Sequence, residues 1–302
     1  GRFGILLFHR IAPCPAGVPP PSHNVTPDRF REQITGLLDR GFTVARLDDL
    51  LEAGRRRRAL PPGTFAITFD DAYEAVYRYA WPVLRELGLP ATVFVSTAFL
   101  DRPEPFPFDG WAHRYWERVP AGVYRPIGAI QCREMAASGL VTLGAHTHTH
   151  GDFRGRASEF RKDLAESLRQ LDARFGQRSW PLALPFGHAD EALVDAARTA
   201  GVTCALTTRA ELIEPDADPF SWGRFNVYQS DVGATLEQAA GPVELAAQRG
   251  QHQRCLAVGV GGVDIEIGVP PQGLGHARRR VAQRQMQRGL AIRIARIGIE
   301  SP

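Results

Sequence analysis

Two adjacent carboxylates, Asp70 and Asp71, directly follow the apolar segment 65–69. Side chains alternate along an extended chain, so we expect the two carboxylates to point in different directions. One could then bind a metal ion while the other faces a substrate. Paired aspartates at the end of a strand are also common as helix caps and turn formers. The pair therefore indicates either a divided catalytic site or a simple turn.

A second cluster places three of the nine histidines within five positions, 146–150. Histidines four residues apart lie on one face of a helical turn, so we expect His146 and His150 to bind one ion while His148 points elsewhere. One aspartate and two histidines leave open coordination positions, as a catalytic zinc or a similar divalent ion requires. The alternative is a solvated histidine cluster.

A third segment, 183–188, contains Pro185, Phe186 and Gly187 at the end of another apolar run. Gly187 permits an unusual backbone turn, and the neighbouring amides could present N–H groups to a developing oxyanion. The same residues also suit an ordinary turn between a strand and a helix.

The elements that must position these residues form an alternating pattern up to about residue 230. Short apolar runs alternate with amphipathic segments, which predicts βα units and a barrel of parallel strands. Catalytic groups in such barrels gather at the carboxyl ends of the strands. The expected strands are 4–8, 43–47, 65–69, 91–95, 141–145, 182–184, 203–206 and 225–228, and the expected helices are 27–40, 72–87, 132–138, 157–175 and 190–200. Pro82 should kink or break the helix that contains it.

Two regions depart from this pattern. Residues 100–130 form a long excursion rich in aromatic residues and proline, and aromatic residues stop altogether after Tyr228. Beyond about residue 232 the sequence is rich in Gln, Arg, Gly and Ala without a βα period. We therefore expect a catalytic domain over residues 1–231 and a C-terminal tail of irregular, uncertain structure over 232–302.

The composition excludes some classes of protein. The chain of 302 residues is 44% hydrophobic and 23% charged, which suits one sizeable globular domain. No apolar run reaches the roughly 18 residues of a membrane span. A formal net charge of +3 gives no reason to expect nucleic acid as a partner. The basic run 55–58 is expected to be a solvated loop, the alternative being contact with an anionic lipid or polymer. Four scattered cysteines suit a reducing compartment, so we predict a cytoplasmic location.

Taken together and in this order, the three segments resemble the polysaccharide deacetylase family, the NodB-homology or carbohydrate esterase family 4 enzymes. The likeness extends from residue 4 to about 227. It is carried by the opening residues 7–11 (LFHRI), the TFDD motif at 68–71, the HTxxH motif at 146–150 and the segment 222–227. The resemblance implies an α/β fold, a distorted (β/α) barrel that commonly has seven strands.

The resemblance also implies the roles of individual residues. Asp70 corresponds to the general base, and Asp71, His146 and His150 correspond to the protein's ligands for Zn²⁺ or another divalent metal. The backbone N–H near Phe186, which follows Pro185, would help to stabilise the tetrahedral oxyanion.

The resemblance identifies the proton donor less directly than the other site residues. The family usually supplies a histidine from a Leu-x-His motif near the C-terminus, and the late histidines His252 and His276 provide no convincing version. Leu7-Phe8-His9 has this pattern at the other end of the chain, as a circularly permuted barrel would require. We assign His9 as the general acid; the alternative is a buried structural histidine.

The chain departs from the family pattern at several points. The family usually has an arginine ahead of Pro-Tyr, whereas this chain reads Ala183-Leu184-Pro185-Phe186. Arg224 is a candidate substitute for this missing arginine, which would orient Asp70; the alternative is a surface role. The Asp-rich fourth motif has no clear counterpart, and Ala72 replaces a frequent glycine.

The resulting hypothesis is a metal-dependent hydrolase that removes acetyl from an N-acetylated sugar or polysaccharide. Aromatic residues of the excursion could stack on sugar rings or could simply cover the barrel; they are Phe106, Phe108, Trp111, Tyr115 and Trp116. One alternative is a catalytically inactive, metal-containing carbohydrate-binding protein, although an intact Asp70 argues against it. Another is an O-deacetylase or a different amide hydrolase.

Overall fold

The computed structural model describes residues 1–176, 179–231, 256–260 and 263–267. The chain divides into two units, Gly1–Leu245 and Ala246–Pro302. In the second unit the described residues form an antiparallel pair of strands, β11 (Leu256–Val260) and β12 (Val263–Ile267). His252, His276 and most of the predicted tail 232–302 lie outside the described residues.

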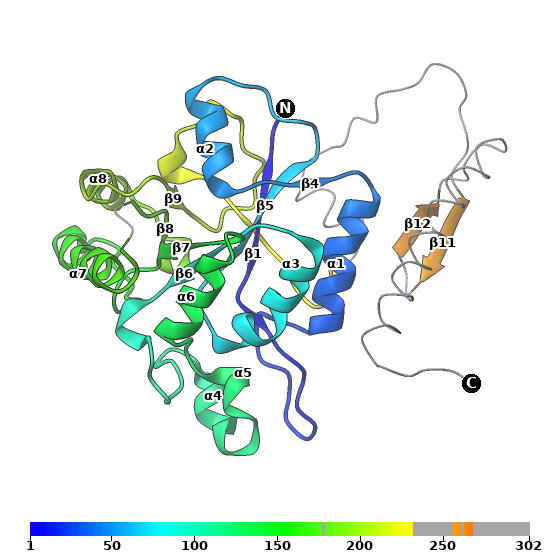
Figure 1. The fold of residues 1–302 in the computed structure, drawn as a ribbon, viewed down its shortest axis with the longest axis horizontal. Helices are drawn as coiled ribbons and strands as arrows, with labels where there is room; N and C mark the ends of the chain where they lie inside the picture. Colours follow the sequence, from blue (N-terminus) through cyan, green and yellow to red (C-terminus); the bar gives the residue numbers. More distant parts are fainter. Residues whose placement is uncertain (177–178, 232–255, 261–262, 268–302) are drawn as a thin grey trace, which may run out of the picture. The chain divides into compact units, whose positions relative to one another are not determined.

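The first unit is built on a curled parallel sheet, which confirms the predicted barrel type (Figure 1). Its strands follow the order β10-β1-β5-β6-β7-β8-β9, and a short strand β4 (Thr43–Val44) also pairs with β5. Their bounds are β1 (Gly4–Phe8), β5 (Thr64–Phe69), β6 (Ala91–Val95), β7 (Val141–Ala145), β8 (Leu182–Ala183), β9 (Ala205–Leu206) and β10 (Phe225–Asn226). A second parallel pair joins β2 (Arg10–Ile11) to β3 (Asn24–Val25).

One short segment near residue 224 connects the two edges of the sheet. Trp222 forms a parallel bridge with Leu206 of β9, and Phe225 pairs with Leu6 of β1. The Thr207 N–H also donates to the Trp222 carbonyl over 2.8 Å. Because this segment reaches both edges, it brings its residues next to β1, and β1 lies next to β5. Arg224, which lies between the two pairings, therefore reaches Thr68 and Asp70 at the end of β5.

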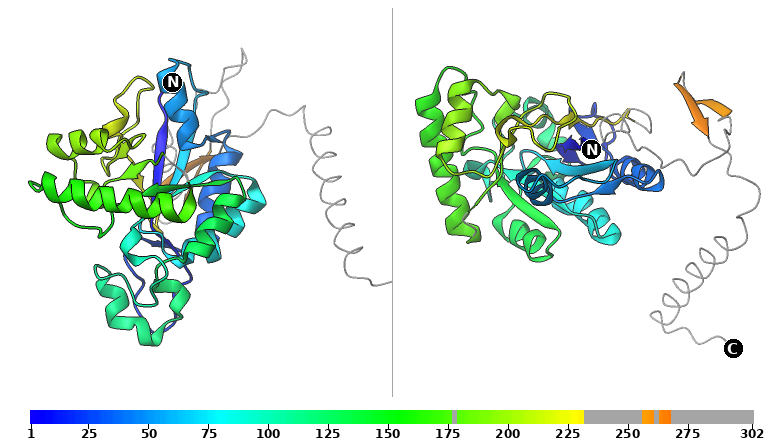
Figure 2. Two further views of the ribbon diagram at one scale, coloured as in Figure 1. Left: turned by 60° about the vertical axis from the view of Figure 1, so that its left-hand side comes forward. Right: turned by 90° about the horizontal axis from the view of Figure 1, so that it is seen from above.

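Helices surround the sheet, as Figures 1 and 2 show. They are α1 (Pro27–Asp39), α2 (Leu47–Arg55), α3 (Trp81–Leu87), α4 (Gly110–Tyr115), α5 (Ala121–Tyr124), α6 (Ala129–Ala137), α7 (Ala157–Phe175) and α8 (Glu191–Thr199). The start of α1 follows from its sequence: the Thr26 side chain accepts the Arg29 N–H, and Pro27 occupies the first turn, where no N–H is needed. Among the helices that the structure describes, none has the length and apolar character needed to cross a bilayer.

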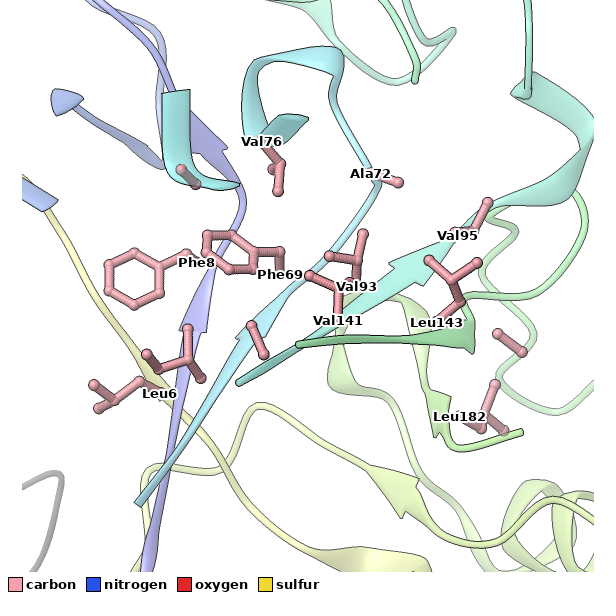
Figure 3. Close-up of a cluster of buried hydrophobic side chains, with 14 of the residues drawn as sticks. Leu6, Phe8, Phe69, Ala72, Val76, Val93, Val95, Val141, Leu143 and Leu182 are labelled. Atoms are coloured by element: carbon pink, nitrogen blue, oxygen red, sulfur yellow. The ribbon is translucent and has the colours of Figure 1, made fainter. Parts of the chain in front are cut away.

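The strands alternate between two buried faces. Leu6 and Phe8 of β1, with Phe69 of β5 and Val93 of β6, belong to the large core between sheet and helices (Figure 3). The residues that alternate with them on the same strands, such as Ile5 and Phe94, turn to a smaller core inside the curl. Period-two alternation therefore decides which strand residues face the inside of the barrel.

Two predicted elements differ in the structure. The predicted helix 72–87 is a turn followed by a π-helix, η1 (Val76–Ala80), and then by α3. The Trp81 N–H donates to the Val76 carbonyl, five residues back. Pro82 has no N–H, so it cannot donate the hydrogen bond that a regular α-helix would have at this position. The wider π turn before it fits this gap in the hydrogen-bond pattern. The predicted strand 43–47 ends at Val44, since Leu47 already begins α2.

The sequence analysis did not predict helix α2. Its residues Leu47 and Leu50 pack into the core inside the curl, together with Phe3 and Ile5 of the first strand region. The basic run begins at the last residue of this helix, and its side chains are exposed. The predicted solvated segment is therefore correct, although Arg55 itself is helical.

The aromatic excursion forms a small projection with the loop 12–23, which we call the side lobe (Figures 1 and 2). It comprises that loop and residues 106–124, which include α4 and α5. The Trp111 indole N–H donates to the Pro19 carbonyl over 2.7 Å, and Arg118 donates to the Gly17 carbonyl over 2.6 Å. Two segments about a hundred residues apart thus fold against each other beside the carboxyl ends of the strands.

We predict that Gly144→Ala destabilises the first unit. A Cβ at Gly144 would lie 2.5 Å from the Phe94 ring and 2.9 Å from the Pro181 carbonyl oxygen. Phe94 is fully buried, so it has little room to yield. The expected loss is about 1–3 kcal/mol of unfolding free energy, measured by urea denaturation.

Gly110→Ala is the matched control, because a Cβ at Gly110 meets no atom within 4 Å. Its unfolding free energy should stay within about 0.5 kcal/mol of the parent protein. Equal stability of the two variants would contradict the proposed close approach of Phe94 to β7.

Candidate active site

The carboxyl ends of β1, β5, β7 and β8 surround a pocket of about 400 Å³. Its lining includes six residues singled out from the sequence: His9, Asp70, Asp71, His146, His150 and Phe186. Residues of the side lobe, among them Phe108, Asp109 and Trp111, close another side of the same pocket. Pro185 and Arg224 are not part of the lining.

Asp71, His146 and His150 converge on one point. The Asp71 Oδ1 atom lies 3.3 Å from Nε2 of His146 and 3.3 Å from Nε2 of His150. One ligand atom from each of the three residues lies within 4.8 Å of the others. Burial alone would raise the pKa of Asp71, but the two imidazole rings hold it well below its usual value. The carboxylate is therefore ionised, as a metal ligand must be.

The surroundings of these residues fit a divalent cation. Asp71 Oδ1 is buried without an aligned hydrogen-bond donor, which is costly unless a cation completes its interactions. The His146 Nδ1–H donates to the Ala183 carbonyl over 2.8 Å, which fixes the ring and leaves Nε2 free as a ligand atom. Two imidazole nitrogens and one carboxylate oxygen form a donor set that zinc accepts in catalytic sites.

The predicted reason for this convergence was wrong. Residues 146–150 do not form a helical turn. Thr147 and His150 instead have left-handed backbones, with φ of 62° and 56°. The Thr147 hydroxyl oxygen accepts the His150 N–H over 3.1 Å and supports this kinked path. His148 turns away, as expected, and its Nδ1 lies 2.9 Å from the Thr97 hydroxyl.

A comparable kink separates the two aspartates. Asp71 and Ala72 have φ values of 68° and 59°, so the chain leaves the extended conformation directly after Asp70. The left-handed backbone at Ala72 explains why glycine suits this position well. After the kink, the Ala72 carbonyl accepts the Ile127 N–H over 2.9 Å, which ties the turn to the excursion. Strand alternation would send the two carboxylates to opposite faces. With this turn both line the pocket, and Nε2 of His146 lies 3.9 Å from Asp70 Oδ2 and 3.3 Å from Asp71 Oδ1.

Asp70 forms a buried ion pair with Arg224. The guanidinium donates to both carboxylate oxygens, each over 2.7 Å, and its Nε–H donates to the Thr207 carbonyl over 2.9 Å. Arg224 has no exposed surface, which excludes the alternative of a surface role. Burial alone would raise the pKa of Asp70, but Arg224 and the His146 ring hold it below its usual value. The carboxylates of Asp70 and Asp71 raise the pKa of His146, although burial alone would lower it.

His9 lies in the pocket with Asp70, at the end of β1. Its ring centroid is 4.8 Å from that of His23, which in turn lies 5.6 Å from Tyr228. Burial lowers the pKa of His9 to about 4, although the charges of Asp71 and Asp70 oppose this effect. His9 is therefore a neutral imidazole at pH 7 in the resting protein.

The turn after β8 is tightly constrained. Phe186 and Gly187 have φ values of 58° and 71°, and Phe186 is 51% exposed in the pocket wall. A Cβ at Gly187 would lie 2.1 Å from the Thr208 hydroxyl oxygen, so only glycine fits there. The N–H groups of Gly187 and His188 donate to the carbonyls of Leu184 and Pro185. The Phe186 amide is thus the candidate donor among residues 186–188.

Sequence reasoning missed the contact between the side lobe and one metal-site histidine. The Phe108 ring stacks on the His150 ring with centroids 3.9 Å apart and planes 24° apart, and Phe186 meets the other side edge-on at 4.8 Å. His150 Nδ1 is buried without a hydrogen-bond partner, so aromatic packing holds this ring. Phe108 therefore faces His150, whereas Phe106 is buried in the lobe and Trp116 is 46% exposed.

Sequence reasoning also missed two buried charge clusters, because their partners are distant in the chain. Arg10 is buried and pairs with Asp109, which also accepts the Tyr73 hydroxyl over 3.0 Å. Glu74 is fully buried and accepts hydrogen bonds from Arg78, Arg125 and Gln131. These clusters fix the segment after Asp71 against the excursion. The only sequence signal is their position beside the motifs.

The sequence profile of the polysaccharide deacetylase family matches residues 57–205. The poly-beta-1,6-N-acetyl-D-glucosamine N-deacetylase of Staphylococcus epidermidis is 24% identical over 227 residues, which is 71% of each chain.

Solved structures share the fold. IcaB from Ammonifex degensii is 26% identical with a TM-score of 0.64, over 76% of this chain and 93% of that one. The Streptococcus pyogenes deacetylase PplD, solved in complex with acetate, is 20% identical with a TM-score of 0.66, over 80% of this chain and 99% of that one. At this lower identity, the likeness concerns the fold.

We predict that Arg224→Met lowers the unfolding free energy at pH 7 by about 3–5 kcal/mol, because it leaves Asp70 buried without its cation. Burial then has less opposition, so the pKa of Asp70 should rise. In the parent protein the depressed pKa means that this stabilisation is lost as pH falls through it. In the variant, protonation relieves the buried charge at higher pH. The stability deficit should therefore shrink between pH 7 and pH 4, as measured by urea denaturation.

Arg198→Met serves as the control, since Arg198 is half exposed and pairs with Asp218 at the surface. It should cost less than about 1 kcal/mol, with no change in deficit across this pH range. The double variant Arg224→Met/Asp70→Asn should recover part of the loss. A deficit independent of pH would show that Arg224 does not control the ionisation of Asp70.

Proposed function

We propose that the chain is a member of the polysaccharide deacetylase family, whose profile matches residues 57–205, and that it hydrolyses the acetamide group of an N-acetylated sugar within a polysaccharide. The observation that carries the proposal is the buried Asp70 carboxylate, held by Arg224 beside the Asp71–His146–His150 cluster. The named activity of the S. epidermidis relative makes β-1,6-linked N-acetylglucosamine the first substrate to test.

In this proposal Asp71, His146 and His150 hold a zinc ion or another divalent cation. The bound cation supplies Lewis acidity toward the acetyl carbonyl oxygen and the attacking water. The cluster supports the proposal through its buried, unpaired Asp71 oxygen and through the free Nε2 of His146.

Asp70 acts as the general base. Its lowered pKa keeps it ionised at neutral pH, and Arg224 fixes both of its oxygens. Each carboxylate oxygen has further acceptor capacity, so Asp70 can still receive the proton of a water molecule in the pocket. The guanidinium acts from behind the carboxylate and therefore orients the base without touching the sugar.

The remaining roles concern the developing charges on the substrate. The Phe186 amide can donate to the oxyanion as the carbonyl carbon becomes tetrahedral. The leaving amine must gain a proton, and His9 is a titratable group in the pocket lining. Because resting His9 is neutral, it has to acquire a proton before it delivers one. The nearby charges of Asp71 and Asp70 favour that protonated form.

Two other functions explain fewer features of the pocket. A metal-containing carbohydrate-binding protein needs no oriented, ionised carboxylate beside the metal cluster, yet Asp70 is buried and paired for that state. An O-deacetylase would use the same base and the same cation. Hydrolysis of an ester, however, has less need for a proton donor such as His9. An alkoxide or phenolate leaves far more readily than the amide anion that would depart from an unprotonated nitrogen.

The proposal predicts acetate release from N-acetylated substrates. We expect release from β-1,6-linked N-acetylglucosamine oligomers, loss of release after chelation, and recovery on addition of Zn²⁺. Asp70→Asn should retain the bound metal but lose turnover by about 10²- to 10⁴-fold, the usual contribution of a general base. Acetate and metal content are measured on the same samples.

The outcomes separate the candidate functions. Stoichiometric metal without acetate from any N-acetylated or O-acetylated substrate would favour the binding protein. Release only from O-acetyl substrates would favour the O-deacetylase. Full turnover by Asp70→Asn would rule out Asp70 as the base, whatever the substrate.

His9→Ala should separate amide hydrolysis from ester hydrolysis. If His9 protonates the leaving amine, kcat for an N-acetyl substrate should fall by about 10²- to 10⁴-fold. Hydrolysis of 4-nitrophenyl acetate should change little, because its phenolate leaves without a proton. Both rates are measured on one metal-loaded preparation, so metal loss cannot imitate the result.

A structural role for His9 would give a different pattern. Disturbance of the fold or of the metal site should lower the amide and ester rates together. Equal losses for the two substrates would therefore reject the assignment of His9 as the acid.

A further inference from the structure

The loop that carries the two metal-site histidines is held from outside by a carboxylate. Asp163, on α7, accepts the His148 N–H over 2.6 Å and the Thr149 N–H over 3.2 Å through Oδ1. Its Oδ2 accepts the Thr149 hydroxyl over 2.5 Å. Three donors from two consecutive residues thus converge on one charged side chain, the arrangement in which hydrogen bonds are strongest.

The hydrogen bonds to Asp163 lie in the part of the loop that separates the two histidines. His148 and Thr149 lie between His146 and His150, and the residues next to them, Thr147 and His150, have left-handed backbones. Left-handed φ is disfavoured for both residue types, most of all for β-branched threonine. Such a path persists only where the surroundings over-determine it.

The opposite side of the loop is fixed independently. The Ala98 N–H donates to the His148 carbonyl over 3.0 Å, and the Ser96 hydroxyl donates to the His146 carbonyl over 3.1 Å. These bonds attach the loop to the end of β6 but leave the N–H groups of His148 and Thr149 without partners from that side. Asp163 supplies the missing acceptors.

Helix α7 can act as a fixed support for Asp163. Phe160 and Leu164, which flank Asp163 on the helix, have no exposed surface and belong to the main core. Movement of Asp163 toward or away from the loop would therefore have to displace buried side chains. Asp163 itself does not line the pocket, and it does not belong to the cluster of potential metal ligands.

We propose that Asp163 is a positioning residue that pre-orders the loop 146–150, so that His146 and His150 present their Nε2 atoms to the divalent cation together with Asp71. The inference rests on the proposed function in one respect, that this cluster holds the cation. Without Asp163 the loop must give up its left-handed path or be ordered by the ion itself, and metal affinity falls accordingly.

The test uses the full chain, with Co²⁺ as the metal. Affinity is measured by competition with a chromophoric chelator, and the visible absorption of bound Co²⁺ reports the ligand geometry. Asp163→Ala should weaken binding about 10- to 100-fold, the usual effect of losing a partner that orients metal ligands. Thr149→Val removes one of the three bonds from an exposed position and should have a smaller effect in the same direction. Thr149→Val also keeps the test valid if Asp163→Ala fails to fold.

Asp163→Asn separates geometry from charge. It keeps an acceptor oxygen for the two N–H groups but removes the negative charge, so its affinity should lie between those of the parent and Asp163→Ala. Binding as weak as in Asp163→Ala would assign the effect to charge and overturn the positioning role. Glu159→Gln, on the same helix, is the matched control, because within the described residues Glu159 pairs only with Arg156, at the surface. Its affinity should equal that of the parent.

Amide hydrogen exchange of the metal-free protein distinguishes failure of this inference from failure of the proposed function. The His148 and Thr149 amides should exchange slowly in the parent and in Glu159→Gln, and rapidly in Asp163→Ala. If the parent binds no metal but this difference in exchange is present, the proposed function fails and the ordering role of Asp163 remains. Unchanged exchange together with unchanged Co²⁺ affinity in Asp163→Ala would overturn the inference.

Discussion

Asp70 and Arg224 are joined by two hydrogen bonds of 2.7 Å in a place from which solvent is excluded. Neither charge could be buried there alone, because desolvation of an unpaired ion costs several kcal/mol. The pair therefore requires that the segment around residue 224 lie beside β5, which in turn requires that the sheet curl until its last strand pairs with β1. Closure of the barrel and ionisation of Asp70 therefore depend on the same contact.

The rest of the site depends on where the strands stop. Three of the chain reversals at the mouth of the barrel use left-handed backbone: at Asp71, at Thr147 and at Phe186. An extended strand would send successive side chains to opposite faces. Here Asp70 and Asp71 both line the pocket, as do His146 and His150. The energetic cost of these conformations is met by hydrogen bonds from neighbouring loops and from α7. The site is therefore rigid for reasons that lie outside the pocket itself.

The side lobe adds a second layer to this arrangement. It brings Phe108 onto the ring of His150, where a hydrogen bond to Nδ1 would otherwise be expected. It also pairs Asp109 with the buried Arg10, which follows His9 in the chain. The excursion, which interrupts the regular βα pattern, thus contacts both the cluster of potential metal ligands and the strand end that carries the proposed acid. Its aromatic residues divide between covering the barrel and facing the pocket.

The sequence by itself determined the strand-forming apolar runs, the parallel barrel, and the two motifs whose residues meet at one point. Those features follow from local periodicity and from residues adjacent in the chain, which a sequence displays directly. It did not determine why His146 and His150 converge, since backbone left-handedness at Thr147 leaves no composition signal. Only the tertiary structure decided that Arg224 is buried against Asp70 and that Asp163 supports the histidine loop. Such pairings join residues far apart in the chain, and their geometry is set by sheet closure and helix packing, which no local pattern encodes.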